Sequence, residues 1–350
     1  MPGRPLAAVA SFALVLAAAC PVSAANDRGP LAIFQDQLAA ASMRAPGHVA
    51  IAVRDLATGL TTGVNQGAEM PAASTIKIPV MVEVFRQLAA GRFDLNTRVA
   101  LRASDRDWGS GELARAAAGS QYSVGALLTV MIDVSDNTAT NMLIRLVGRQ
   151  RINTTMRQLG LTHTRLSDFI RSSGPIRWAL RSSPADMVRL LDRMAREQLI
   201  DEWSSRAMIS ILSDQQHNGL LPEPLPFGTA VAHKTGTLHD TLNDVGIVYL
   251  GGEPYVIAVM TTDLPTLDAG RRFIRGVSRL AYDALGRFAS WREESGYPAF
   301  SLGASRFPPL ETPDQQMWSN PQAESAAPDS EVVPVATPAT PAPAAAPAPL

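Results

Sequence analysis

A serine and a lysine lie three residues apart in the stretch PAASTIKIPV, at Ser74 and Lys77. Side chains three residues apart share one face of a helix, so these two could meet. A serine hydroxyl becomes an effective nucleophile when a nearby base takes its proton. A lysine can be that base if burial or a second cation lowers its pKa toward neutrality. The alternative is an ordinary helix start with a serine N-cap and a solvated lysine, and the pair alone does not decide between the two.

Two later stretches contain the polar groups that such chemistry would need. The segment VSDNTATNML carries Ser135 and Asn137 on a predicted turn between two helices. The segment AVAHKTGT carries Lys234, a second cation, on a predicted strand. Three small residues follow that lysine: Thr235, Gly236 and Thr237. A glycine in a strand lets another backbone approach closely, and a strand-edge N–H beside it can donate to an oxyanion.

The three motifs together form a known signature. Ser-x-x-Lys, Ser-Asp-Asn and Lys-Thr-Gly, in this order, occur in class A β-lactamases and penicillin-binding proteins. The sequence resembles this family of penicillin-recognising serine enzymes over about residues 31–285, and the stretches ALLTVMIDVSDNTATNMLI and LGLTHTRL also look like it. The resemblance implies that Ser74 is the acylated nucleophile.

The resemblance implies catalytic roles for four residues. Ser74 Oγ would attack a strained lactam or an acyl-D-alanyl carbonyl, and Lys77 would accept its proton, directly or through water. Ser135 would relay a proton toward the leaving nitrogen. Lys234 would add positive potential that keeps Lys77 less basic.

It also implies how a substrate would be held. Asn137 would bind the substrate amide, and Thr235 and Thr237, on either side of Gly236, would bind its carboxylate. The backbone N–H groups of Ser74 and Thr237 would form an oxyanion hole. No metal or cofactor is expected, and the histidines lack ligand spacing; His233, beside the Lys-Thr-Gly motif, is interpreted as structural.

One element of the family pattern is missing. A class A β-lactamase hydrolyses its acyl-enzyme with a glutamate that follows the Thr-Arg-Leu stretch, and counting forward places that glutamate at Ile170. Residues 164–187 contain neither a glutamate nor an asparagine. Asp168 is the sole acid there before Asp186, so it is the tentative deacylation base, with an ordinary surface aspartate as the alternative.

Three functions remain open from the sequence. The favoured one is β-lactamase-like hydrolysis by a serine hydrolase whose loop has been rebuilt. The second is a D-alanyl-D-alanine peptidase acting on peptidoglycan, for which the missing glutamate is no defect. The third is a non-catalytic peptidoglycan-binding protein that keeps the fold. General-base catalysis is worth about 10²–10⁴-fold, so its loss would slow turnover enough for penicillin to trap the enzyme.

The order of the predicted elements indicates an α+β fold, an α/β sandwich of the β-lactamase/transpeptidase type. A hairpin is predicted over residues 48–65, three β-type runs over residues 228–264, and amphipathic helices over residues 31–43 and 269–288. Strands at both ends with a helical middle predict one antiparallel sheet flanked by helices, with an inserted all-helical subdomain. We expect the α/β part at about residues 26–70 and 220–290, and the helical part at about 71–219.

The two termini differ from this domain, which is predicted over residues 26–307. Residues 1–24 have the pattern of a secretory signal peptide, and Cys20 within it could alternatively be lipidated. Residues 308–350 form a Pro/Ala-rich tail expected to be disordered. We therefore predict a periplasmic or secreted protein, or a lipoprotein, that acts as a monomer on a β-lactam or peptidoglycan-like small substrate. The formal net charge of −1 gives no reason to expect a nucleic acid or a membrane surface as partner.

Overall fold

A five-stranded antiparallel sheet is the centre of the fold. The computed structural model describes residues 29–173, 178–251 and 253–298. The strand order is β2-β1-β10-β9-β8, with every neighbouring pair antiparallel. The predicted signal peptide, Cys20 and the C-terminal tail lie outside the described residues.

The sheet is built from both ends of the domain, as the sequence predicted. The first two strands form the expected hairpin: β1 (His48–Asp55) and β2 (Thr61–Val64). The other three strands come from the C-terminal part: β8 (Val231–Leu238), β9 (Thr241–Val248) and β10 (Tyr255–Thr262). The two groups join where β1 pairs with β10. All residues of β9 and β10 are buried, because helices cover both faces of the sheet.

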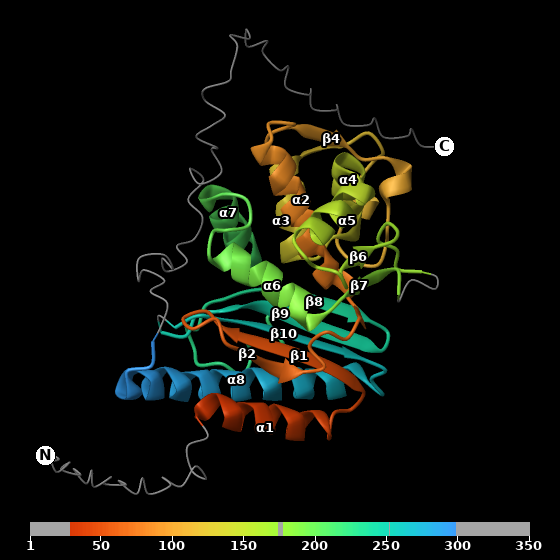
Figure 1. Cartoon of the computed structure of the whole chain (residues 1–350). Helices are drawn as coiled ribbons and strands as arrows, with labels where there is room; N and C mark the ends of the chain where they lie inside the picture. The colour runs from red at the N-terminus through yellow and green to blue at the C-terminus, as the bar shows by residue number, and fades with distance from the viewer. Residues whose placement is uncertain (1–28, 174–177, 252, 299–350) are drawn as a thin grey trace, which may run out of the picture.

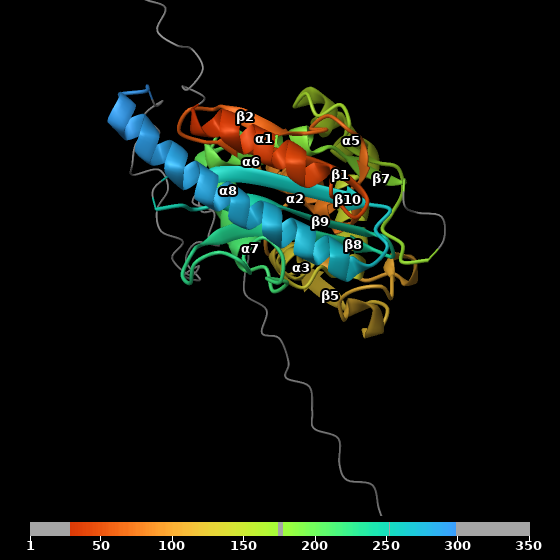
Figure 2. The same ribbon diagram turned by 90° about the horizontal axis from the view of Figure 1, so that it is seen from below.

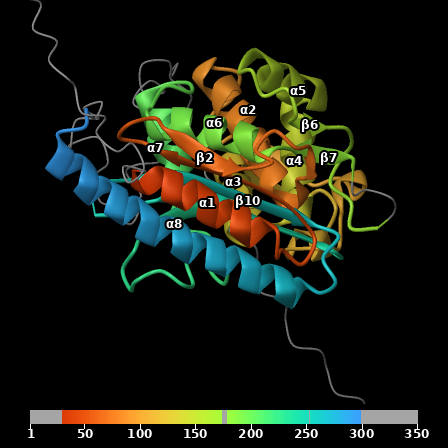
Figure 3. The ribbon, with the colours of Figure 1, turned by 60° about the horizontal axis from the view of Figure 1, so that its bottom comes forward.

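One face of the sheet is covered by the first and last helices. These are α1 (Pro30–Ser42) and α8 (Leu267–Ser295), which lie side by side across it (Figures 2 and 3). Phe34 and Leu38 of α1 pack in the core beneath the sheet with Ile274 of α8. The buried face of α1 ends at Leu38, and Met43, the residue directly after the helix, is 80% exposed.

The other face carries the helical part of the fold (Figure 1). Its helices are α2 (Lys77–Ala89), α3 (Val124–Asp133), α4 (Asn137–Val147), α5 (Arg149–Gln158), α6 (Pro184–Ala195) and α7 (Glu202–Ser213). In α2, every side chain except those of Arg86 and Ala89 is buried, so α2 is the central helix of this layer. Helix α6 starts with a Ser183 cap, whose side chain accepts a hydrogen bond from the Asp186 N–H.

The inserted part, predicted to be all-helical, also contains short strands. Strands β3 (Met70–Pro71), β7 (Leu180–Ser182) and β6 (Arg165–Leu166) form a small sheet, and β4 (Arg98–Ala100) pairs with β5 (Gln121–Ser123). Three single 3₁₀ turns occur here: η1 (Ala73–Ile76), η2 (Ala103–Asp105) and η3 (Leu113–Arg115). These elements are too short to produce a periodic pattern. Among the described helices, none is both long and apolar enough to cross a bilayer.

Candidate active site

The proposed nucleophile lies on the turn that leads into the central helix. Ser74 is part of η1, and α2 begins at Lys77 directly after it. Ser74 makes no capping hydrogen bond to α2, and Lys77 is completely buried. The alternative of a serine cap with a solvated lysine is therefore wrong. Ala73, just before the serine, has a φ of +48°, a left-handed conformation that costs about 1–3 kcal/mol for a residue other than glycine.

The Lys77 ammonium is enclosed by three oxygen atoms of the Ser-Asp-Asn turn. Its Nζ lies 2.6 Å from the Ser135 carbonyl oxygen, 3.0 Å from Ser135 Oγ and 2.8 Å from Asn137 Oδ1. Two of these, the carbonyl and the amide oxygen, can only accept hydrogen bonds. A neutral Lys77 amine would donate its two N–H groups to them and keep its lone pair for a hydroxyl proton.

The environment of Lys77 favours the neutral amine. Burial lowers the pKa of Lys77 well below its ordinary value, and the positive charge of Lys234 lowers it further. The carboxylates of Asp136 and Asp107 oppose this shift. Lys234 is itself completely buried, which lowers its pKa to about 7, against the opposing effect of Asp244. The positive charge of Lys234 thus disfavours the charged form of Lys77.

The Ser-Asp-Asn turn is held in a strained conformation between α3 and α4. Ser135 has a φ of +60°, and its side chain is buried. Asp136 caps α4 by accepting a hydrogen bond from the Ala139 N–H at 2.8 Å, and its second carboxylate oxygen accepts one from the Leu113 N–H at 2.9 Å. These bonds offset the strain and keep the Ser135 hydroxyl beside Lys77.

Strand β8 passes very close to the nucleophile turn at Gly236. A Cβ atom at this position would lie 2.9 Å from the Ala72 carbonyl oxygen and 3.2 Å from the Ser74 backbone nitrogen. Asn243 of β9 is the cross-strand partner of Gly236. Its side-chain Nδ2 donates to the Ala72 carbonyl oxygen at 3.1 Å and to the Pro71 carbonyl oxygen at 2.8 Å. The glycine is required for this close approach, which brings the edge of β8 beside the N–H of Ser74.

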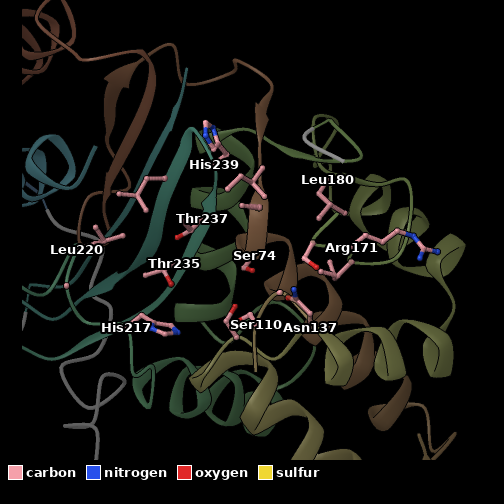
Figure 4. Close-up of a pocket in the computed structure, with 18 of the residues that line it drawn as sticks. Ser74, Ser110, Asn137, Arg171, Leu180, His217, Leu220, Thr235, Thr237 and His239 are labelled. Carbon is pink, nitrogen blue, oxygen red and sulfur yellow. The ribbon is translucent and has the colours of Figure 1, made fainter. Parts of the chain in front are cut away.

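A cavity of about 580 Å³ opens over these groups. Figure 4 shows Ser74 at its centre, with Thr235 and Thr237 on the β8 side and Asn137 on the side of α4. Ser135 also lines the cavity, whereas the two lysines lie beneath its surface. Four of its other lining residues are basic: Arg171, His217, His239 and Arg271. Among the described residues, no carboxylate lines it.

The position at which the family has its glutamate lies inside this cavity but is apolar. Ile170 lines the cavity and is 5% exposed. Asn141 of α4 fixes its backbone, since the amide accepts from the Ile170 N–H at 2.8 Å and donates to the Ile170 carbonyl at 3.0 Å. The residue at this position of the cavity lining therefore has no group that can take a proton from water.

Asp168, the tentative replacement for the glutamate, lies away from the cavity. Its carboxylate accepts a hydrogen bond from the next residue, the Phe169 N–H, and lies 3.7 Å from Arg171 Nε. The side chain is 48% exposed, and Asp168 is not among the residues that line the cavity. This placement fits the alternative of a surface aspartate and gives no support to a role in deacylation.

Known proteins share this fold and part of the sequence. The sequence model of the β-lactamase enzyme family matches residues 33–285 of the chain. The chain belongs to this family. A β-lactamase from Sphaerobacter thermophilus is 32% identical, with a TM-score of 0.67, and the match covers 72% of this chain and 96% of that one. The penicillin-binding protein PBP-A is 30% identical, with a TM-score of 0.70 and coverage of 73% and 97%.

The extended-spectrum β-lactamase TLA-1 is similar in fold, with a TM-score of 0.68 at 19% identity, covering 72% of this chain and 98% of that one. These similarities confirm the α+β fold class and the family predicted from the three motifs. Of the predicted site residues, Lys77 is in direct contact with Ser135 and Asn137. It also places Thr235 and Thr237 across the cavity from Asn137 (Figure 4).

His233 has a structural role in the core below the site. It is completely buried, its Nδ1 lies 2.8 Å from Asp244 Oδ1, and its Nε2 lies 3.0 Å from Asn218 Oδ1. Both ring nitrogens are therefore occupied. Across the described residues, no group of three or more histidine, cysteine, aspartate or glutamate side chains could hold a metal ion.

One buried acid next to the site, Asp107, was not predicted from the sequence. Asp107 lies in the loop before η3 and is 7% exposed. Its carboxylate accepts a hydrogen bond from Asn137 Nδ2 at 2.7 Å. In the sequence this residue is one more aspartate in a polar loop, 30 positions from its partner, so nothing in the local pattern distinguishes it.

Proposed function

We propose that this protein is a serine acyltransferase of the penicillin-binding type. In this proposal Ser74 is acylated by β-lactams and by acyl-D-alanyl peptides, and the acyl-enzyme is released slowly. One observation carries the proposal: the cavity holds the groups needed for acylation, while Ile170 occupies the position of the base that would be needed for rapid hydrolysis.

Acylation starts with the proton of Ser74. The neutral Lys77 amine takes this proton as Ser74 Oγ forms a bond to the carbonyl carbon of the substrate. The developing oxyanion is bound by the backbone N–H groups of Ser74 and Thr237, which the close approach at Gly236 brings to the same side of the cavity. The proton then passes through Ser135 Oγ, 3.0 Å from Lys77 Nζ, to the leaving nitrogen as the C–N bond breaks.

The substrate is oriented by the two walls of the cavity. Asn137 holds the amide on the acyl side, and Thr235 and Thr237 hold the carboxylate on the β8 side. The basic lining favours an anionic ligand here, because Arg271 adds to the positive potential of Lys234.

Release of the acyl group requires a water molecule activated by a base. The described lining offers no carboxylate for this purpose, and Ile170, which also lines the cavity, has an apolar side chain that cannot activate water. A general base contributes about 10²–10⁴-fold, so hydrolysis is expected to be slower by that factor than in an enzyme that has the glutamate. A peptide amine as acceptor avoids this requirement, because an amine is itself a good nucleophile.

β-Lactamase-like hydrolysis, favoured from the sequence alone, is the second candidate. The similarity to the Sphaerobacter thermophilus β-lactamase, at 32% identity, favours it. The similarity to PBP-A, at 30%, favours the first candidate. For PBP-A, an acyl-enzyme complex with penicillin G is known in a point mutant. We rank the penicillin-binding type first because of the apolar residue at position 170.

The site of action is proposed from the N-terminal sequence. A secretory signal over residues 1–24 would deliver the protein to the periplasm or the exterior, with lipidation at Cys20 as the other route. Peptidoglycan, the polymer whose peptides end in D-alanine, would be accessible there.

Labelling with a fluorescent penicillin tests the proposal. We expect covalent labelling of the wild-type protein, a mass increase localised to the peptide that contains Ser74, and no labelling of Ser74→Ala. A folded wild-type protein that no β-lactam labels would contradict the proposal and favour the non-catalytic peptidoglycan-binding alternative. Release of D-alanine from an acyl-D-alanyl-D-alanine peptide, measured by mass spectrometry, tests the peptidase activity directly.

A further inference from the structure

A chain of four side chains connects Lys77 to the loop that carries Ile170. Lys77 Nζ donates to Asn137 Oδ1 at 2.8 Å, and Asn137 Nδ2 donates to Asp107 Oδ1 at 2.7 Å. The other carboxylate oxygen of Asp107 accepts from the Ser172 N–H at 2.6 Å and from Ser172 Oγ at 3.1 Å. Asn137 and Ser172 both line the cavity, and Asp107 joins them from behind.

Asp107 is itself firmly held. Its backbone N–H donates to Thr138 Oγ1 at 3.1 Å, and that hydroxyl donates back to its carbonyl at 3.2 Å. Its Oδ1 also accepts from the Gly109 N–H at 3.0 Å. The carboxylate thus accepts four hydrogen bonds, from Asn137, Gly109 and Ser172. Asp107 is therefore held in place on both its backbone and its side chain, as a residue that positions its neighbours must be.

The amide of Asn137 can in principle have either of two orientations, related by a flip that exchanges Oδ1 and Nδ2. While Lys77 is charged, its three N–H groups require Oδ1 to face them. Once Lys77 is the neutral amine, this constraint disappears, because Nδ2 could then donate to the lone pair. In the flipped orientation the lone pair would be occupied and could not receive the Ser74 proton.

Asp107 removes this ambiguity. As a carboxylate it can only accept, so it requires Nδ2 of Asn137 to face it in both charge states of Lys77. We propose that Asp107 is the positioning residue that fixes the Asn137 amide during acylation and ties its orientation to the loop at Ser172. The inference rests on the proposed acylation of Ser74. It adds a residue that acts through Asn137 and does not touch the substrate.

The proposal predicts the behaviour of Asp107→Asn. An asparagine at position 107 can offer either an acceptor or a donor, so the Asn137 amide is free to flip. We expect the second-order acylation rate with a fluorescent penicillin to fall roughly 10- to 100-fold at the pH of maximum rate, as for loss of a charge-assisted hydrogen bond. In the Asn137→Ala background the same change should have no further effect, because residues that act through one another are not additive.

Asp55→Asn is the matched control. Asp55 is also a buried carboxylate, but it accepts hydrogen bonds from the N–H and the hydroxyl of Thr58 in the β1–β2 hairpin and does not line the cavity. The charged groups that act on Lys77 are Lys234, Asp136 and Asp107, so Asp107→Asn lowers the pKa of Lys77 further. Asp107→Asn should therefore move the acid limb of the acylation profile to lower pH and also lower the maximum rate by the stated factor, whereas Asp55→Asn should leave both unchanged.

Two outcomes would overturn the inference. One is an Asp107→Asn protein that acylates at the wild-type maximum rate, and the other is an effect that multiplies with that of Asn137→Ala. If Asp107→Asn does not fold, Asp107→Glu keeps the charge but displaces the carboxylate, and a wild-type rate in that variant would equally refute a role in positioning.

A readout without substrate separates this inference from the proposed function. In nitrogen-15 NMR spectra, one N–H of the Asn137 side chain should show the downfield shift and slow exchange of a hydrogen bond to a carboxylate, and Asp107→Asn or Asp107→Glu should abolish it. Absence of that signature in the wild-type protein would refute the role of Asp107 even if Ser74 is acylated. Failure of penicillin labelling with the signature present would refute only the proposed function.

Discussion

The substitution Gly236→Ala tests the link between backbone geometry and the oxyanion hole. The added Cβ would lie 2.9 Å from the Ala72 carbonyl oxygen, about 0.5 Å closer than the 3.4 Å at which ordinary contacts begin. It would also lie 3.1 Å from Ala73 Cβ and 3.2 Å from the Ser74 nitrogen. Two of these three atoms belong to backbone, which cannot rotate away, so β8 and η1 must separate.

The cost can be estimated for both activity and stability. An oxyanion-hole donor acts at 2.7–3.1 Å, and removing one costs about 10²–10³-fold in rate. A separation of several tenths of an ångström takes the Thr237 N–H out of this range, so we expect the acylation rate to fall about 100-fold. Overpacking of this kind also lowers the free energy of unfolding by about 1–3 kcal/mol.

The assay is stopped-flow acylation by a fluorescent penicillin, with thermal unfolding measured in parallel. Gly276→Ala is the matched control, because nothing lies within 4 Å of a Cβ at that position of α8. In a helix this change should increase stability by about 0.5–1 kcal/mol and leave acylation unaltered. A Gly236→Ala protein that acylates and unfolds like the wild type would refute the role given to the close approach of β8.

Three other substitutions test the site. Ile170→Glu should shorten the lifetime of the penicillin adduct by about 10²-fold or more, because it places a base in the cavity. An unchanged lifetime in a folded variant would show that position 170 does not face the acyl group. Lys234→Met should raise the melting temperature most at pH 7, and the gain should shrink toward pH 10. Burial lowers the folded-state pKa of Lys234 to about 7 from 10.5, so wild-type stability rises across that range. A gain that grows with pH would contradict the lowered pKa of Lys234. Asn141→Leu should lower the free energy of unfolding by about 2–3 kcal/mol, because it leaves the Ile170 N–H and the carbonyls of Ile170 and Asp105 without hydrogen bonds. Thermal denaturation that matches the wild type would argue against the role of Asn141 in holding this loop.

The sequence predicted those elements whose signals are local. The hairpin of β1 and β2 and the three C-terminal strands each depend on a pattern within a few residues, and all of them are present. The turn at Ser135 was found from the motif VSDNTATNML, since Asp136 is both part of that motif and the cap of α4.

What the sequence could not predict depends on contacts between distant segments. Asp107 and Ser172 are 65 positions apart, and their hydrogen bonds have no local pattern. The burial of Lys77 and Lys234, which shifts the pKa of both, is a property of the assembled core and not of the stretch around either residue. The tentative role of Asp168 came from counting along a loop whose side-chain directions only the structure reveals.

The lifetime of the penicillin adduct on Ser74 is the most direct test of the claim that this site acylates but lacks a base for hydrolysis. Wild-type protein would be mixed with penicillin, freed of excess reagent, and followed by intact-protein mass spectrometry. We predict an adduct that persists for hours and that Ser74→Ala does not form. An adduct that disappears within seconds, with regeneration of the free enzyme, would contradict the account and establish an efficient hydrolase that uses a base other than residue 170.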